Sequence, residues 1–261
     1  MMKRFPLAIA AGLIPLALVA PGAASAQIVE LGQTTSSPII APSCPANVPA
    51  TQCLIILTHT TAIQSLTSGV MNPTKVKSAG WIVSFTIGLS QLSSDAKTEL
   101  GFLHGLDTAY GGTPQVALTV LKPGKSNKYT VVAQSGTYHL IPFLGQVLQQ
   151  PMSLPSSFST FTALPVKPGD VIGLTVPTWA PVLSYDLTAS KYSYRQSRST
   201  KCQVAVGSQQ DPGETAQTTV GASASYLCTY TGTRVEYSAT EVVNQPYPKT
   251  YVGGPTTTTK K

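Results

Sequence analysis

The sequence contains little charge and few histidines. Lysine, arginine, aspartate and glutamate together make up 10% of the chain, whereas about a quarter is usual in soluble domains. The 21 glycines and 21 prolines disfavour long amphipathic helices and favour short strands joined by turns. The histidines, His59, His104 and His139, lie far apart in the sequence, so each is expected to be an ordinary strand or loop residue.

Sequence motifs of several enzyme and metal-site classes are also absent. The chain has no G-x-S-x-G elbow, no H-E-x-x-H motif and no C-x-x-C pair. We therefore expect no cofactor and no metal site. A calcium site is an alternative, because Asp95, Glu99 and Asp107 share the segment 91–112, although no EF-hand spacing orders them. Glycosidases generally need two facing carboxylates, and nothing in the sequence brings together any two of the acids near expected strands: Asp170, Asp186, Glu236 and Glu241.

Only one long apolar stretch is present, and it lies at the start of the chain. Lys3 and Arg4 precede the apolar residues 5–19, and Ala24-Ser25-Ala26 matches a small-x-small cleavage site. The stretch is short and rich in proline for a membrane span. We therefore predict a signal peptide over 1–26, an extracellular location, and a mature chain without a transmembrane segment. An uncleaved anchor is the alternative.

The four cysteines suit an oxidising compartment. Four cysteines allow three pairings. Proximity in the sequence favours the pairs Cys44–Cys53 and Cys202–Cys228, and buried free thiols are the alternative.

The pattern of apolar residues predicts an all-β protein, a single antiparallel β-sandwich over 44–244. We expect an irregular leader over 27–43, a long loop over 91–112 and a flexible Thr/Lys tail over 245–261. The residues after Gln115 indicate a β-hairpin with a Pro-Gly loop. Within GWIVSFTIGL, a period of two predicts one buried face composed of Trp81, Val83, Phe85, Ile87 and Leu89.

A sharp turn is predicted at Pro168-Gly169-Asp170. Proline followed by glycine is typical of a type II turn, because the second central position needs a positive φ. Asp170 can bond to the nearby backbone, and the apolar run Val171–Val176 favours a buried strand. We expect the turn to be a corner that leads into the core, and a ligand or calcium site at Asp170 is the alternative.

Basic and aromatic residues alternate in the tract KYSYRQSRSTK. Its charge attracts anionic groups, and its aromatic rings can stack on sugars or bases. The alternative is a solvated loop or an edge strand whose basic residues prevent further pairing. No nucleic-acid motif accompanies the tract, so we expect no nucleic-acid partner. The candidate ligand-binding residues are Lys191, Tyr192, Tyr194, Arg195, Arg198 and Lys201.

Three stretches together resemble a group of uncharacterised secreted β-sandwich proteins from soil actinobacteria. They are W-x-V-x-F at Trp81–Phe85, V-x-L-x-V-L-K-P-G at Val116–Gly124 and F-x-x-L-P-V-K-P-G-D-V-I-G-L at Phe161–Leu174. The G-D-x-I-x-L element is also similar to jelly-roll modules that bind carbohydrate. The resemblance implies a secreted β-sandwich of jelly-roll type.

The predicted function is a non-catalytic binding or cell-surface protein. Its expected partner is an extracellular glycan or an anionic cell-envelope polymer. A polysaccharide-active enzyme and a purely structural envelope protein are the alternatives.

Overall fold

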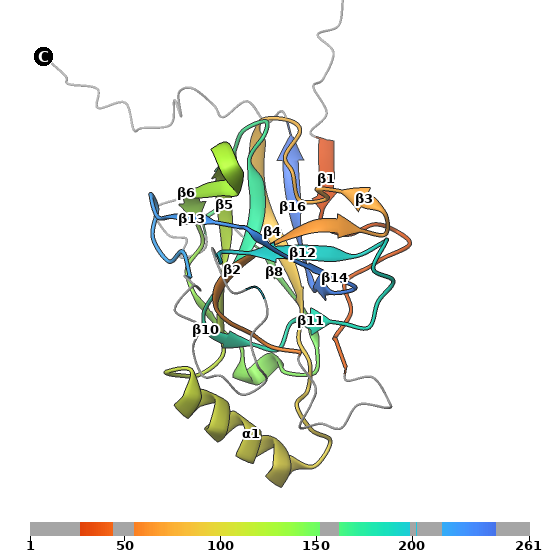
Figure 1. Cartoon of the computed structure of the whole chain (residues 1–261), viewed down its shortest axis with the longest axis vertical. Helices are drawn as coiled ribbons and strands as arrows, with labels where there is room; N and C mark the ends of the chain where they lie inside the picture. The colour runs from red at the N-terminus through yellow and green to blue at the C-terminus, as the bar shows by residue number, and fades with distance from the viewer. Residues whose placement is uncertain (1–26, 44–54, 152–161, 199–201, 203–215, 244–261) are drawn as a thin grey trace, which may run out of the picture.

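The protein folds into antiparallel sheets that enclose a common core. The structure, a computed structural model, describes residues 27–43, 55–151, 162–198, 202 and 216–243 (Figure 1). Strands account for 50% of the structure and helices for 11%. The prediction of an antiparallel, β-rich fold is confirmed.

Two sheets contribute most of the core. The smaller sheet has the order β1 (Gln27–Leu31), β16 (Tyr237–Val243), β4 (Gly80–Gly88) and β8 (Val147–Pro151), and β9 (Leu164–Val166) also pairs with β4. The larger sheet, which curls as a half-barrel, has the order β13 (Ser223–Ser225), β6 (Lys128–Gln134), β5 (Gln115–Pro123), β10 (Val171–Ala180), β2 (Leu57–Thr67), β12 (Ser193–Gln196) and β14 (Cys228–Thr231). β3 (Val70–Met71) pairs with β2, β7 (Tyr138–His139) with β5, and β11 (Leu183–Ser184) with β15 (Arg234–Val235).

The core lies between these two sheets. Fully buried side chains of β4 belong to the same apolar cluster as those of β5 and β10. They include Phe85, Ile87, Leu118, Val120, Ile172 and Leu174. Burial of large apolar side chains from both sheets is the main stabilising contribution to such a fold. The predicted hairpin after Gln115 is confirmed as β5 and β6, joined through the 3-10 turn η2 (Lys125–Asn127).

The predicted buried face of β4 is only partly correct. The last three of its five positions are buried, but Trp81 and Val83 are half-buried, and Ile82 between them is fully buried. The pairing of β4 with β16 skips Val83, so this residue forms a β-bulge. A bulge adds one residue to a strand and reverses the alternation of its side chains beyond that point.

The leader predicted as irregular over 27–43 contains a strand, and that part of the prediction is wrong. Gln27–Leu31 forms β1, which pairs with β16 along its whole length. The following residues are held by Arg234, which is 3% exposed and donates hydrogen bonds to the carbonyl oxygens of Gly32, Ser37 and Pro38. These long-range bonds leave no periodic signal in the sequence.

The segment 91–112, predicted as a loop, contains the helix α1 (Ala96–Ala109), so this prediction is also wrong. Asp95 caps the helix, since its Oδ1 accepts a hydrogen bond from the Thr98 N–H at 2.8 Å. None of the helical residues is buried. The helix is attached to β10 through Trp179, whose indole N–H donates to Asp107 Oδ1 at 3.0 Å.

The predicted corner at Pro168-Gly169-Asp170 is confirmed. Gly169 has a φ of +94°, and Asp170 Oδ2 accepts a hydrogen bond from the Lys167 N–H at 2.8 Å. β10 starts at the next residue, Val171, and is buried along nearly all its length. Another 3-10 turn, η3 (Ile141–Phe143), links β7 and β8.

The disulfide Cys202–Cys228 is present, as predicted. The other predicted pair, Cys44–Cys53, lies outside the described residues, as do the predicted signal peptide over 1–26 and the tail over 245–261. None of the helices in the described part of the chain is long and apolar enough to cross a membrane.

Replacing Gly169 by valine should destabilise the fold. No atom lies within 4 Å of the position that a Cβ would take, so the cost comes from the positive φ alone. It should be about 1–2 kcal/mol of unfolding free energy, measured by urea denaturation. Gly136→Val is the matched control, because this exposed glycine also has open space around its Cβ position but no positive φ. Equal stability of the two variants would contradict the assignment of the turn.

Candidate functional site

The central residues of the basic and aromatic tract after Lys191 form neither a solvated loop nor an edge strand, so both of these expectations are wrong for them. These residues form β12, which lies between β2 and β14. Tyr194 is 5% exposed and stacks on Tyr230, with ring centroids 4.9 Å apart. Arg198 is 1% exposed and donates a hydrogen bond to the Tyr230 hydroxyl at 3.1 Å. Tyr194 and Arg198 are therefore buried in the described structure.

The other candidates in this tract differ in their exposure. Tyr192 is half-buried, and its hydroxyl shares a hydrogen bond with the Ser37 hydroxyl at 3.2 Å. Arg195 is half-buried, and Lys191 is exposed. Lys201 lies outside the described residues. A ligand role for Lys191, Tyr192 and Arg195 stays a prediction.

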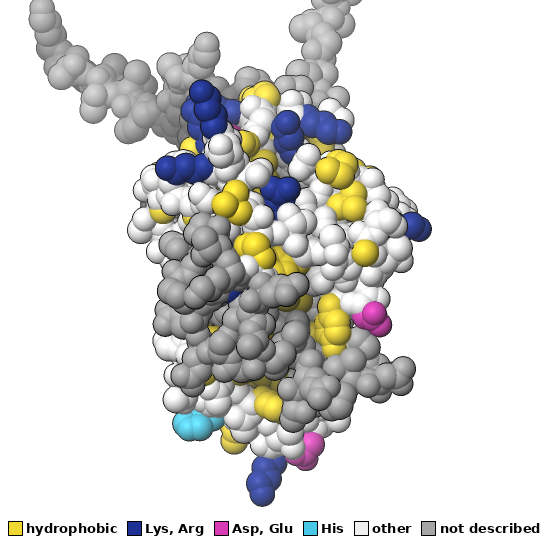
Figure 2. Space-filling view, viewed as in Figure 1, with side chains coloured by type: hydrophobic (Ala, Val, Ile, Leu, Met, Phe, Trp, Pro, Cys, Tyr) yellow, Lys and Arg dark blue, Asp and Glu magenta, His cyan; other side chains and the backbone are white. Residues whose placement is uncertain are grey.

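A different set of basic residues gathers at one end of the molecule. Six of the eight lysines in the described residues lie on the segment 72–78, at the turn end of the β5–β6 hairpin and on the β9–β10 turn, and all six are exposed. Figure 2 shows the dark-blue side chains concentrated at the upper end of the molecule, opposite helix α1 of Figure 1. We call this surface the lysine-rich end; it consists of Lys75, Lys77, Lys122, Lys125, Lys128 and Lys167.

Backbone pairing at the start of β10 brings the three segments together. Val171 is opposite Leu121 of β5 and also bridges to Lys75. The Gly169 N–H donates to the Val76 carbonyl at 3.0 Å, and the Val76 N–H donates to the Asp170 carbonyl at 2.8 Å. The segment 72–78 is therefore fixed against the β9–β10 turn, beside the end of β5.

The carboxylates near this end do not pair with the lysines. Asp170 is 8% exposed and accepts its hydrogen bond from backbone. Glu30 is half-buried and accepts hydrogen bonds from the Ser238 and Thr240 hydroxyls. Within the described residues, none of the six lysines forms an ion pair with a carboxylate. The lysine-rich end therefore presents uncompensated positive charge, which attracts anions.

A groove runs between the β5–β6 hairpin and the β9–β10 turn. It has a volume of about 590 Å³. Lys122 and Lys167 line it together with the Pro168-Gly169-Asp170 turn, and Pro123, Val132 and Pro165 supply apolar surface. The turn is thus a structural corner and also part of the rim of a groove with two cationic side chains.

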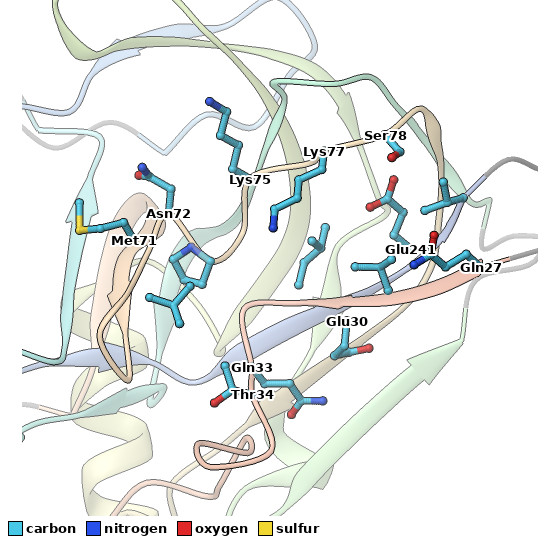
Figure 3. Close-up of a pocket in the computed structure, with 15 residues that line it drawn as sticks. Gln27, Glu30, Gln33, Thr34, Met71, Asn72, Lys75, Lys77, Ser78 and Glu241 are labelled. Carbon is cyan, nitrogen blue, oxygen red and sulfur yellow. The ribbon is translucent and has the colours of Figure 1, made fainter.

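A pocket of about 310 Å³ lies on the other side of the segment 72–78, between this segment, β1 and β3 (Figure 3). The side chain of Lys77 points into it, whereas that of Lys75 points away. Glu241 of β16 also lines the pocket. Glu30 is on the neighbouring strand but lies on the opposite face of the sheet, because it is paired with Thr240 and adjacent residues alternate.

Glu241 is a buried carboxyl group. Its side chain is 1% exposed, and Oε1 has no hydrogen-bond partner. Burial raises the pKa of Glu241 above its ordinary value, because the charged form loses its hydration. The position of this carboxyl follows from the bulge in β4, which the sequence pattern did not indicate.

The sequence did contain a signal for the lysine-rich end. The triplet Lys-Pro-Gly occurs at 122–124 and again at 167–169. The first triplet spans the end of β5, and the second precedes β10, its antiparallel neighbour. The end of one strand and the start of an antiparallel neighbour lie at the same edge of a sheet. The repeated triplet marks the two turns, but only the pairing of β5 with β10 makes the two lysines neighbours.

The metal and catalytic alternatives gain no support from the geometry. The part of the chain that the structure describes contains no group of three or more metal-ligating side chains. Of the acids in 91–112, Asp95 caps the helix and Asp107 binds the Trp179 indole. Of the acids considered for a glycosidase, Glu236 forms an ion pair with Arg234 at 3.4 Å.

Comparison of the chain with protein-family models, with curated proteins and with solved structures gives no significant match. The resemblance to secreted β-sandwich proteins therefore stays a prediction.

Glu241→Gln should change how stability depends on pH. The carboxyl pKa in the folded protein is raised above the unfolded value of about 4.3. The protonated carboxyl therefore favours the folded state at low pH, and this contribution is lost as the pH rises through the folded pKa. We expect the variant to have a higher Tm than the wild type at pH 7 and nearly the same Tm below about pH 4.

Glu30→Gln is the control for this experiment. Its carboxylate accepts hydrogen bonds from two hydroxyl groups, so its replacement should lower the Tm at pH 7. Thermal denaturation over a pH series measures both effects. A Glu241→Gln protein that is less stable than the wild type at pH 7 would contradict the burial of an unpartnered carboxylate.

Proposed function

We propose that this protein is a secreted, non-catalytic binding protein that contacts an anionic cell-envelope polymer through its lysine-rich end. The observation that supports the proposal is the placement of six exposed lysines at three adjacent sites, the segment 72–78, the end of the β5–β6 hairpin and the β9–β10 turn. The nearby carboxyl groups of Asp170 and Glu241 are buried. A polymer with repeated negative charges can contact several of these lysines at once. Each exposed contact is weak in water, but the release of counterions from the polymer adds with every contact.

The groove favours a charged polymer over a neutral glycan. Neutral sugars are commonly held by stacking on exposed aromatic rings, and the exposed large apolar residues in the described part of the chain include no aromatic side chain. Lys122 and Lys167 at the groove instead offer ammonium groups, which bind phosphate, sulfate or carboxylate as point charges.

The arrangement of carboxyl groups supports a non-catalytic role. A glycosidase acts with two carboxyl groups that face one substrate. Glu30 and Glu241 are the acids that line the pocket of Figure 3, and the alternation of β1 and β16 directs them to opposite faces of the sheet. Asp170 at the groove is engaged with the Lys167 backbone.

We also propose that the protein is secreted and that its strands are arranged as a jelly roll. The sequence over 1–26 has the three parts of a signal peptide, and the disulfide Cys202–Cys228 suits an oxidising compartment. Pairing between strands distant in the sequence, such as β1 with β16 and β2 with β10, is compatible with a jelly roll.

Loss of charge at the groove should weaken polymer binding. We expect Lys122→Ser combined with Lys167→Ser to reduce affinity for dextran sulfate about tenfold at about 50 mM salt, and to flatten the salt dependence. Neutral dextran should not bind. The Tm should change little, because exposed charges contribute little to stability. Isothermal titration calorimetry measures the affinities.

The matched control is Lys97→Ser combined with Lys191→Ser, which removes the same charge from exposed positions outside the lysine-rich end. This variant should bind dextran sulfate nearly as the wild type does. If the control loses more affinity than the groove variant, the proposal for the lysine-rich end is wrong.

Export is tested independently. Intact-mass analysis of protein collected from the culture medium should give a chain that begins at Gln27, with or without cyclisation of this residue. A chain that retains residues 5–19 would contradict the predicted cleavage after Ala26 and indicate a membrane anchor.

A further inference from the structure

A buried carboxyl group without a partner is unusual in a protein interior. Most buried polar groups have a hydrogen-bond partner, and an exception often marks the place of an ion or ligand. Glu241 Oε1 is such an exception, since it is buried and accepts no hydrogen bond. It is also one of the groups that line the pocket of about 310 Å³ beside the lysine-rich end.

Two local features of the backbone create the space for this carboxyl. The bulge at Val83 places Glu241 opposite Ile82. Next to it, Gly80 has no side chain, and a Cβ there would lie 3.1 Å from Glu241 Oε1 and 2.4 Å from the Val242 carbonyl oxygen. Any other residue at position 80 would crowd the carboxyl. Bulges and close-approach glycines are typical of strands that position a functional side chain.

An opposite charge faces the same space. Lys77 is exposed, and in Figure 3 its side chain enters the pocket from the segment 72–78. It forms no ion pair with Glu241. The pocket therefore has a cationic and an anionic group with room for a ligand between them. Gln27 and Ser78 lie beside the carboxyl and offer further hydrogen bonds.

Other charged groups do not alter this arrangement. On β1, the residues on the Glu241 side of the sheet are Gln27, Val29 and Leu31, whose side chains carry no charge. The predicted cleavage after Ala26 would add an α-amino group at Gln27 unless this residue cyclises. On β4, the neighbouring residues are Gly80 and Ile82. The titratable groups around the pocket are those of Lys75, Lys77 and Glu30, and only Lys77 points into it.

We propose that this pocket binds a unit that carries a primary amine next to an anionic group, with the amine at Glu241 and the anion at Lys77. A simple anion would be attracted by Lys77 but repelled by an ionised Glu241. A metal ion would find no second carboxylate on the same face. A ligand with both charges satisfies both side chains. This inference rests on the proposed function, because it identifies the anionic polymer as one with amine substituents.

Small phosphate esters test the pocket separately from the polymer. O-phosphoethanolamine and glycerol 3-phosphate share a phosphate group, but only the first carries an amine. By calorimetry at pH 7.5, the wild-type protein should bind phosphoethanolamine about tenfold more tightly, as expected for a partly buried charge-assisted hydrogen bond. Glu241→Gln should bring the two affinities together, and Lys77→Met should weaken both.

The preference of the wild-type protein should also disappear as the pH falls and Glu241 becomes protonated, which tests the inference without a substitution. Equal binding of the two esters at pH 7.5, or a preference that survives in a folded Glu241→Gln protein, would overturn it. The double variant Lys122→Ser and Lys167→Ser should lose dextran sulfate affinity but keep the preference for the amine. If dextran sulfate binding depends on these lysines and no amine preference exists, only the pocket inference fails.

Discussion

The register of β10 against its two neighbours determines where the lysine-rich end is built. β10 lies between β5 and β2, and its apolar side chains Ile172, Leu174 and Val176 face the shared core. Its other face carries Thr175, whose hydroxyl contacts the hydroxyls of Thr119 and Thr61 at 2.6 and 2.9 Å. A shift of one residue would exchange these two faces and place the hydroxyl group in the apolar core.

Two glutamines extend the hydrogen bonding of these threonines: Gln134, whose Nε2 donates to Thr119 Oγ1 at 2.8 Å, and Gln217. The Gln217 N–H donates to Thr61 Oγ1 at 3.0 Å, and its side-chain amide donates to the carbonyl oxygens of Tyr129 and Ala222. A buried network of this kind stabilises a structure only when its members are satisfied together, so it specifies one register. That register also fixes the end of β5 relative to the start of β10, and therefore the backbone positions of Lys122 and Lys167. A site whose backbone is already ordered loses less entropy when it binds a ligand.

Local signals allowed part of this structure to be predicted from the sequence. The turn at Gly169, the β5–β6 hairpin and the pairing of Cys202 with Cys228 each depend on residues close together in the chain or on a specific backbone angle. The strand β1 was missed because its stability comes from pairing with β16, at the other end of the described chain. The bulge at Val83 was missed because it forms where β4 pairs with β16. The alternation of apolar residues along β4 does not indicate it.

The surroundings of the basic and aromatic tract could not be predicted for a related reason. Alternating basic and aromatic residues occur on exposed binding surfaces. They also occur in central strands, where their long side chains pack against residues of the neighbouring strand. Tyr194 stacks on Tyr230, and Arg198 bonds to the same tyrosine; these contacts exist only because β14 pairs beside β12. The sequence of the tract shows which side chains are present, but the neighbouring strand decides whether solvent reaches them.

A ligand bound at the lysines should also influence the buried carboxyl. Burial raises the pKa of Glu241, and an anion bound at Lys77 would raise it further because like charges repel. A purely anionic ligand should therefore make Glu241 harder to ionise. A ligand amine at Glu241 acts in the opposite direction. Because binding and ionisation are linked, affinity for a purely anionic polymer should rise as Glu241 becomes protonated, whereas affinity for an amine-bearing polymer should be greatest while it is ionised. One buried side chain thus gives the surface a means of distinguishing two polymers of similar charge density.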